Sequence, residues 1–421
     1  MSSPRAQFAV FILVATAVYG GLHAYLWWKS TRQLGLRGPA ALGLGLFFAA
    51  MVAAPFLGRL FRDGSALFNA VELVTFVWMG IAFYLFWLNL GVDLYNFTAA
   101  IARRVAPVGS IPALGGPRLF WSIAAATALI VSWAAVEAAS VRIRRVPVPT
   151  TKLAPGTQPL RIVQVSDLHL GLLVGRRRLE PILERVREAR PDLLVATGDM
   201  LDAVGDHLEP LAAMWRDVTP PLGKYAVTGN HEYYTGIPGA IAFLEGAGFR
   251  VLRDETAVLP GLANVIGKEY RAPQSLPGSL PRPRRLADLM RDGDPALFAL
   301  LLNHLPTGFE EEAAPLGVDL QLSGHTHDGQ MFPFRWLVRL SFRHLAGLHR
   351  RGDSLLYVSR GTGTWGPPLR FLAPPEVTLF ELVPAETGTL GGRFPVSPVG
   401  QGTDPRDPHL TKGDRVGLRN P

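Results

Sequence analysis

Long apolar runs fill the first third of the chain, and short alternating runs fill most of the remainder. Each long run can cross a hydrocarbon core of about 30 Å, which takes roughly 20 helical residues. Trp27 and Trp28 lie at the end of the first run, and amphipathic aromatic rings favour the membrane interface. We therefore predict a four-helix transmembrane anchor within residues 1–145, in place of buried core helices or a cleaved signal peptide. Its spans are residues 7–28, 40–58, 70–92 and 119–139.

An even number of spans places the N-terminus and the large C-terminal part on the same side of the membrane. Basic residues on the two faces nearly balance, and Lys152 tips the positive-inside count toward a cytoplasmic C-terminal part. Asp93 and Glu137 lie near the ends of their runs, where a charged side chain reaches the interface. The runs therefore indicate a multi-pass anchor and not a transporter.

After a Pro- and Thr-rich linker at residues 146–159, short β-rich runs alternate with amphipathic helical runs. This alternation is typical of an α/β layered domain, which we place at residues 160–384. The expected strands are residues 161–166, 192–197, 223–228, 262–266, 297–302, 318–323, 355–359 and 376–382. The expected helices are residues 178–189, 208–215, 238–246, 284–291 and 307–314. Residues 271–283 should form a surface excursion, and residues 385–421 should form a disordered tail because they offer little to bury.

Composition narrows the function classes. The chain carries 42 Lys and Arg against 34 Asp and Glu, and it has no Cys. Residues 1–140 supply 9 of the basic and 4 of the acidic side chains, so no single domain is basic enough to predict nucleic acid as a partner. Without cysteine, disulfide frameworks, thiolate zinc sites and cysteine nucleophiles are excluded. Any metal must be held by His, Asp, Glu, Asn or Gln.

Candidate chemistry gathers just after five of the predicted strands. The C-terminal strand ends of an α/β sheet form its ligand crevice, so these five loops should converge. Each piece alone is ambiguous, because Asp-x-His is also common in turns and helix caps, and His-x-His occurs without a metal. Together, imidazole, carboxylate and amide oxygen form a ligand set for Mn, Fe or Zn. The side chains concerned are Asp167, His169, Asp199, Asn230, His231, His304, His325 and His327.

These segments carry a resemblance to a known family. Asp-x-His (167–169), Gly-Asp-x-x-Asp (198–202), Gly-Asn-His-Glu (229–232), His304 and Gly-His-Thr-His (324–327) resemble, in order, the signature of calcineurin-like metallophosphoesterases. Residues 359–363 and 374–376 resemble later blocks of the membrane-associated branch, and the anchor is similar to that of transmembrane proteins with a metallophosphoesterase domain. The resemblance covers roughly residues 160–383. It implies two packed mixed β-sheets flanked by helices, the metallophosphoesterase sandwich.

The resemblance also implies two divalent metal ions and a role for each residue. Asp167, His169 and His327 would hold one ion, Asn230, His304 and His325 would hold the other, and Asp199 would bridge them. His231 would stay outside the metal sites and act on the substrate as the catalytic residue. Two cations about 4 Å apart lower the pKa of a shared water toward 7 and neutralise phosphoryl oxygens, so that hydroxide attacks phosphorus. Asp202 and Glu232 would orient ligands, with an ordinary capping role as the alternative.

Departures from the family pattern narrow the subclass. Ala203 and Val204 follow Asp202 where phosphoprotein phosphatases carry Arg-Gly, which argues against a phosphoprotein substrate. Asp328 stands beside His-x-His, where it could tune a metal or face solvent. Within residues 332–351, a helix would align Arg335, Arg339 and Arg343, and this basic face could rest on lipid headgroups or form a lid on its own domain.

The sequence thus predicts a membrane-anchored, metal-dependent phosphoric ester hydrolase. Its substrate would be a phosphorylated small molecule or a lipid, and the anchor favours a lipid-linked compound. Monoester, diester (a phosphodiesterase) and pyrophosphate all stay open. The alternative from a different class is a catalytically silent metal-binding membrane receptor or scaffold.

Overall fold

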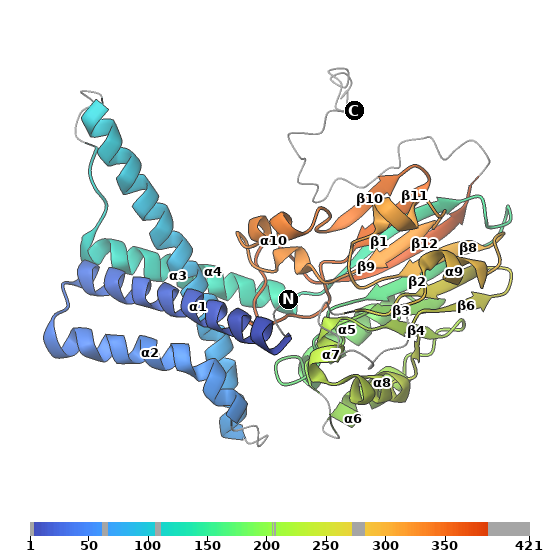
Figure 1. Cartoon of the computed structure of the whole chain (residues 1–421), viewed down its shortest axis with the longest axis horizontal. Helices are drawn as coiled ribbons and strands as arrows, with labels where there is room; N and C mark the ends of the chain where they lie inside the picture. Colours follow the sequence, from blue (N-terminus) through green and yellow to red (C-terminus); the bar gives the residue numbers. More distant parts are fainter. Residues whose placement is uncertain are drawn as a thin grey trace, which may run out of the picture.

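The computed structural model describes residues 4–60, 66–105, 111–203, 205, 208–271 and 283–385. Four long helices form the N-terminal region, drawn in blue to cyan in Figure 1: α1 (Pro4–Leu34), α2 (Gly38–Leu60), α3 (Ala66–Val105) and α4 (Gly116–Ala139). Among the described residues, three segments are long and apolar enough to cross a membrane: Gly38–Pro55, Asn69–Val105 and Gly116–Ala139. Helix α1 contains the first predicted span, whose crossing stays a prediction.

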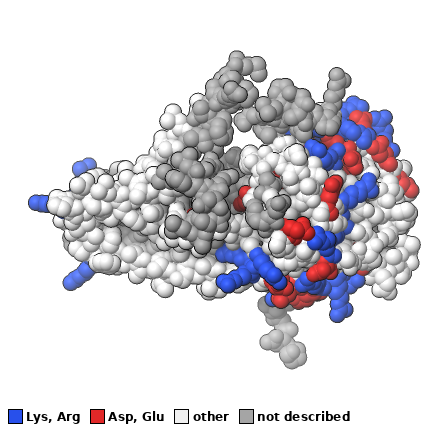
Figure 2. All heavy atoms as spheres, turned by 90° about the horizontal axis from the view of Figure 1, so that it is seen from below, with Lys and Arg blue, Asp and Glu red and all other residues white. Residues whose placement is uncertain are grey.

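Charge is distributed as a membrane-spanning region requires. Figure 2 shows charged side chains gathered over the sheet-containing region and a broad uncharged surface over the helices. Asp93 is paired: Lys29 Nζ lies 2.5 Å from its Oδ1, and Tyr25 Oη donates to its Oδ2 at 2.7 Å. These contacts join α1 to α3, so the acidic side chain near the end of its run is neutralised between helices.

The remaining chain folds into two six-stranded mixed sheets. The first has the order β1 (Arg142–Thr150), β12 (Glu376–Pro384), β2 (Leu160–Val165), β3 (Leu193–Thr197), β4 (Lys224–Val227) and β5 (Arg250–Val251). The second has the order β10 (Gly347–Arg351), β11 (Ser354–Val358), β9 (Leu320–Ser323), β8 (Phe298–Leu302), β7 (Ala263–Gly267) and β6 (Glu255–Leu259). Strands β2 to β5 are mutually parallel, as are β7, β8, β9 and β11.

The sheets pack face to face with helices outside them. Along β2, Ile162 is buried in the core between the sheets, whereas Val163 is buried in the core under the helices. Helices α5 (Arg176–Glu188), α6 (Glu209–Arg216) and α8 (Ile237–Gly246) cover the first sheet, and α9 (Leu286–Arg291) and the π-helix η2 (Phe309–Ala313) cover the second. The predicted pair of mixed sheets flanked by helices is therefore confirmed.

Two local differences from the sequence prediction concern the expected linker and the expected arginine-bearing helix. Strand β1 includes residues 146–150 of the expected linker and pairs with β12. Its prolines, Pro147 and Pro149, are tolerated because β1 is an edge strand. The helix expected to align three arginines is short: α10 (Arg335–Ser341) ends before Arg343, and β10 follows, so that part of the prediction is wrong. Residues 272–282 and 386–421, expected as excursion and tail, lie outside the described residues.

The sheet region packs directly on the helical region. Helix α4 ends at Ala139 and β1 begins at Arg142, so two residues connect them. Residues 367–373, here called the docking loop, lie against α3 and α4: the Arg370 amide donates to the Ala134 carbonyl at 3.0 Å, and Leu369 is buried with Tyr84 and Ala134. The Glu137 carboxylate accepts from the amides of Leu372 (3.3 Å) and Ala373 (3.0 Å). Glu137 therefore holds the docking loop at the end of α4.

Candidate metal centre

The five predicted strand ends meet at one place, at the end of the sandwich where parallel strands of both sheets terminate. Loops after β2, β3 and β4 come from the first sheet, and loops after β8 and β9 come from the second. Parallel strands end on the same side of a sheet, which is why segments far apart in sequence converge here. The structure brings together all eight residues singled out at the strand ends: Asp167, His169, Asp199, Asn230, His231, His304, His325 and His327.

The first group of donor atoms comes from β2 and β9. His169 Nε2 lies 3.1 Å from His327 Nε2, which lies 3.4 Å from Asp167 Oδ1. Asp167 is fully buried, and its Oδ2 has no hydrogen-bond partner among the described residues. A buried carboxylate oxygen without a hydrogen-bond partner is costly, and a bound cation would compensate that cost, so this group fits a metal ion.

The second group centres on His304. Its Nε2 lies 3.1 Å from Asn230 Oδ1, 3.1 Å from His325 Nδ1 and 3.3 Å from Asp199 Oδ2. Its Nδ1 lies 2.8 Å from the Thr197 carbonyl, which can only accept, so Nδ1 carries the proton. In the neutral ring, Nε2 then presents a lone pair to other acceptor atoms, an arrangement that a cation would stabilise.

The spacing of these atoms fits divalent ions. Metal–nitrogen and metal–oxygen bonds of about 2.1 Å place neighbouring ligand atoms roughly 3.0 to 3.4 Å apart in octahedral or tetrahedral coordination. The separations above fall in this range. Asp199 has oxygens near His169 and His231 as well as near His304 and His325, so it belongs to both neighbourhoods.

Two further acidic side chains, those of Asp202 and Glu232, hydrogen-bond to this cluster and its loops. Asp202 Oδ1 lies 2.7 Å from His169 Nδ1 and 2.7 Å from His231 Nδ1, which leaves Nε2 of each ring free to act elsewhere. Glu232 lies in α7 (Asn230–Thr235) and accepts from the backbone amides of residues 199, 200, 201 and 229. Glu232 thus fixes the loop carrying Asp199 against the loop carrying Asn230, beyond an ordinary capping contact.

Charges and burial within the cluster shift the pKa values of its histidines. Burial opposes protonation of His304, but Asp199 and Asp167 outweigh burial and raise the pKa of His304 to about 9. Burial likewise opposes protonation of His169, while Asp202 and Asp199 raise its pKa to about 9. Burial and the neighbouring His304 lower the pKa of His325 to about 3, which keeps that ring neutral. The cluster therefore attracts positive charge and retains neutral nitrogen donors.

The backbone at the centre is strained. Asp167, His169, Asp199, His325 and His327 all have left-handed backbone conformations, with φ between 50° and 71°. Such a conformation costs a non-glycine residue about 1–3 kcal/mol and persists where the surroundings hold it, as at functional sites. The glycines of the motifs serve close approach: a Cβ at Gly229 would overlap Asp199 Oδ1.

Sequence reasoning missed Arg370, and of the two positions it left open for Asp328 the solvent-facing one is wrong. Arg370 is fully buried, and its guanidinium lies 3.3 Å from His327 Nδ1. The only sequence signal was its position between the two later motif blocks. Asp328 neither faces solvent nor joins the donor groups; it is buried between Arg335 (2.9 Å) and Arg360 (3.2 Å).

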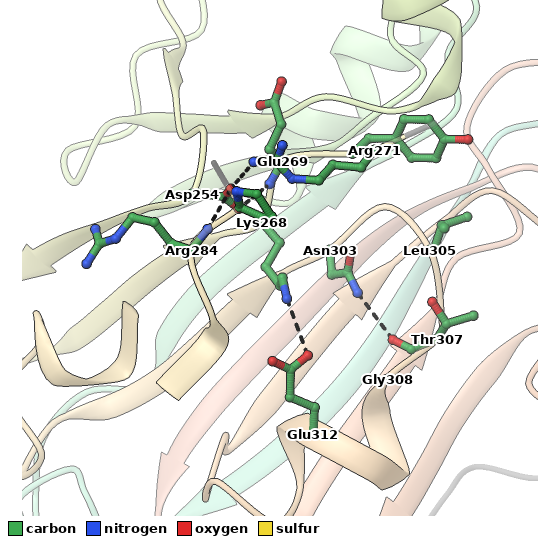
Figure 3. Close-up of a pocket in the computed structure, with 12 residues that line it drawn as sticks. Asp254, Lys268, Glu269, Arg271, Arg284, Asn303, Leu305, Thr307, Gly308 and Glu312 are labelled. Atoms are coloured by element: carbon green, nitrogen blue, oxygen red, sulfur yellow. Dashed lines mark hydrogen bonds and ion pairs between the residues drawn. The ribbon is translucent and has the colours of Figure 1, made fainter. Parts of the chain in front are cut away.

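A polar pocket flanks the second group of donors. It has a volume of about 250 Å³ and is lined by Tyr270, whose ring lies 6.0 Å from that of His304, and by Asn303. Figure 3 shows Lys268 pointing at Glu312 across it, at 3.3 Å, and Asp254 also pairs with Arg271. These pairs largely cancel the pocket's charges, so it offers hydrogen bonds more than a net field.

Comparisons with known proteins agree with this geometry. Residues 160–329 match the family model of calcineurin-like phosphoesterases. An "Uncharacterized metallophosphoesterase" of Aquifex aeolicus is 36% identical over 253 residues, which cover 60% of this chain and 95% of the relative. One from Helicobacter pylori J99 is 33% identical over 58% of this chain and 64% of its own length. A "Transmembrane protein with metallophosphoesterase domain" of Danio rerio is 28% identical over 89% of this chain and 88% of its own length.

Proposed function

Since this chain belongs to the calcineurin-like metallophosphoesterase family, we propose that it is a membrane-anchored phosphoesterase with two divalent metal ions that hydrolyses a phosphate ester or a pyrophosphate. The observation that carries the proposal is the pair of donor groups joined by Asp199. In this proposal Asp167, His169 and His327 hold one ion, and Asn230, His304 and His325 hold the other. The donor set suits Mn, Fe or Zn.

The chain's own residues would bind and orient the substrate and move a proton. When bound, the two ions would supply an activated water and neutralise phosphoryl oxygens. His231 donates its Nδ1 proton toward Asp202 at 2.7 Å, so its Nε2 is the atom that would serve the leaving oxygen. The His231 side chain is only 14% exposed, which limits competing water. Through these hydrogen bonds Asp202 would fix the orientation of this ring and of the His169 ring.

The helical region holds the catalytic region at the membrane, which supports a lipid-linked substrate and raises the question of topology. We propose that α1 to α4 all cross the bilayer and that the catalytic region, from β1 to residue 384, lies on the side of the N-terminus. Figure 1 places the start of α1 and the end of α4 at the same end of the helical region, facing the sheets, as four crossings require. The near balance of basic residues, tipped by Lys152, favours the cytoplasmic side.

The test uses the full chain in detergent with Mn and an aryl phosphate. Asp199→Ala removes the shared carboxylate and His304→Ala removes the centre of the second group, so both should abolish turnover. Asp192→Asn is a matched control, because Asp192 pairs with Arg161 (2.8 Å) where β2 and β3 begin, at the opposite ends of these strands from the donor groups, and should retain activity. Full activity in both alanine variants would refute the assignment. Metal binding by the wild type without hydrolysis of any ester in a lipid and nucleotide phosphate panel would favour the silent receptor instead.

A further inference from the structure

A band of exposed apolar side chains lies on the catalytic region beside the helices. We call it the apolar rim. Leu340 is 84% exposed and Trp336 is 59% exposed, and both lie on α10. Large exposed apolar groups that lie together mark a contact surface. The rim consists of Phe334, Trp336, Leu337, Leu340, Trp365 and Leu372.

The charged side chains of the same segment are engaged within the domain. Arg335 pairs with the buried Asp328 at 2.9 Å, and Arg343 pairs with Glu310. Arg339 also has an interaction partner. The segment therefore presents apolar groups outward and keeps arginines occupied, which fits contact with lipid chains better than the basic face predicted from sequence.

The rim is continuous with the helices that cross the membrane. The Phe334 ring lies 6.3 Å from that of Phe83 on α3. Met331, just before α10, is buried with Tyr84 and Ala134 of α3 and α4, and Leu372 is held at the end of α4 by Glu137. Because these contacts fix the rim beside the point where α4 meets the sheets, the bilayer spanned by the helices lies next to it (Figure 1).

The rim also reaches the candidate metal centre. The Trp365 ring lies 6.0 Å from that of His231. Phe342, directly after α10, lies 5.1 Å from His325. An amphiphile whose chains stay among the rim side chains would therefore bring a phosphate at headgroup depth within reach of His231, with the polar pocket beside His304 open to its headgroup.

We propose that the apolar rim inserts into the surface of the bilayer that the helices span, and that it selects amphiphilic phosphates held in that bilayer. The membrane contact stands on the rim alone. The substrate class rests on the proposed function.

The chain's lack of cysteine allows a direct test of the membrane contact. Single cysteines at Leu340, Leu129 and Val258 of the full chain, labelled with a nitroxide in vesicles of phosphatidylcholine and phosphatidylglycerol, report access to oxygen in lipid and to a nickel chelate in water. Leu129 on α4 is 73% exposed and serves as the lipid reference, while Val258 on β6 is 42% exposed, at the end remote from the helices (Figure 1). The nitroxide at Leu340→Cys should show the high oxygen access and low chelate access of the nitroxide at Leu129→Cys. Chelate access equal to that of Val258→Cys would overturn the contact.

A pair of esters tests the substrate class. Nitrophenyl methyl phosphate stays in water, whereas nitrophenyl phosphate esterified with a long alkyl chain stays in the vesicle. In a Trp336→Ser, Leu340→Ser variant, the ratio of long-chain to methyl ester turnover should fall about tenfold or more, because apolar contact area is lost. An unchanged ratio would overturn selection by the rim. If the wild type turns over the aryl phosphate but cleaves neither ester, selection by the rim is overturned and the proposed function stands. If the wild type hydrolyses neither these esters nor any phosphate of the panel, the proposed function fails with the substrate class. The nitroxide result decides the membrane contact in either case.

Discussion

Replacing Asp202 with asparagine removes the charge from a carboxylate that two histidines share. The same oxygen, Oδ1, lies 2.7 Å from Nδ1 of His169 and 2.7 Å from Nδ1 of His231. The substitution keeps the size of the side chain and an oxygen that can accept. It changes two charge-assisted hydrogen bonds into neutral ones, and the two rings have different proposed tasks.

The magnitude follows from the contacts. A hydrogen bond to a charged group contributes about 1.5–3 kcal/mol and a neutral one about 0.5–1.5 kcal/mol. Each contact should therefore lose about 1.2 kcal/mol, the difference between the midpoints of these ranges, which is close to tenfold in an equilibrium or rate constant. The weaker hydrogen bond to His169 should reduce metal affinity about tenfold, and the weaker hydrogen bond to His231 should slow turnover about tenfold at saturating metal. At limiting metal the two losses should multiply to about a hundredfold.

The assay is aryl phosphate turnover across a Mn titration, with metal affinity measured separately by calorimetry. Excess metal should restore the activity that is lost through weaker metal binding at His169. It should not restore the activity that is lost through His231. In a His231→Ala background, Asp202→Asn should therefore weaken metal binding without slowing turnover further at saturating metal. A tenfold loss of saturated turnover in that background would refute the role assigned to Asp202 through His231.

Two further predictions concern protons and the docking loop. Because neighbouring carboxylates raise the pKa of His169 and of His304 to about 9, protons compete with the metal below that pH. The apparent Mn affinity should therefore keep rising from pH 6.5 to 9, with protons released on binding. Calorimetry in buffers of different ionisation enthalpy measures the proton release, and a plateau of the affinity above pH 6.5 would contradict the prediction. Glu137→Ala leaves the amides of Leu372 and Ala373 without their acceptor, and the loss at the buried Ala373 amide is about 1–3 kcal/mol. Hydrogen exchange of residues 369–373 should therefore accelerate at least about fivefold, with Glu137→Gln intermediate. Unchanged exchange in the full-length variant would show that the carboxylate does not hold the loop.

The strands that support the centre could be predicted because their signals are local. All eight predicted strands are present, since buried parallel strands form uninterrupted apolar runs, as in residues 298–302. The candidate metal ligands could be located because each follows such a run. Strand β1 could not be predicted in this way, because Pro147 and Pro149 resemble a linker until the edge position is known.

Other features depend on tertiary contacts that no local pattern carries. The left-handed conformations of Asp167 and Asp199 are held by neighbouring loops from other strands. Arg370 is buried because Leu369, one residue earlier, packs between membrane helices, and this pairing joins residues more than 200 positions apart in the sequence. The pairing of Arg335 with the buried Asp328 engages one of the three arginines within the domain, beside the exposed apolar side chains of α10.

The two-residue connection from α4 to β1, together with the docking loop, fixes the working height of the catalytic region above the lipid. A domain on a long flexible tether would move through the water near the membrane and meet substrates dissolved there. With the lipid-linked substrate proposed above, a domain held in this way would search in two dimensions. Its encounter rate would follow the surface density of that substrate in one leaflet, and dilution of the vesicles should leave that rate unchanged.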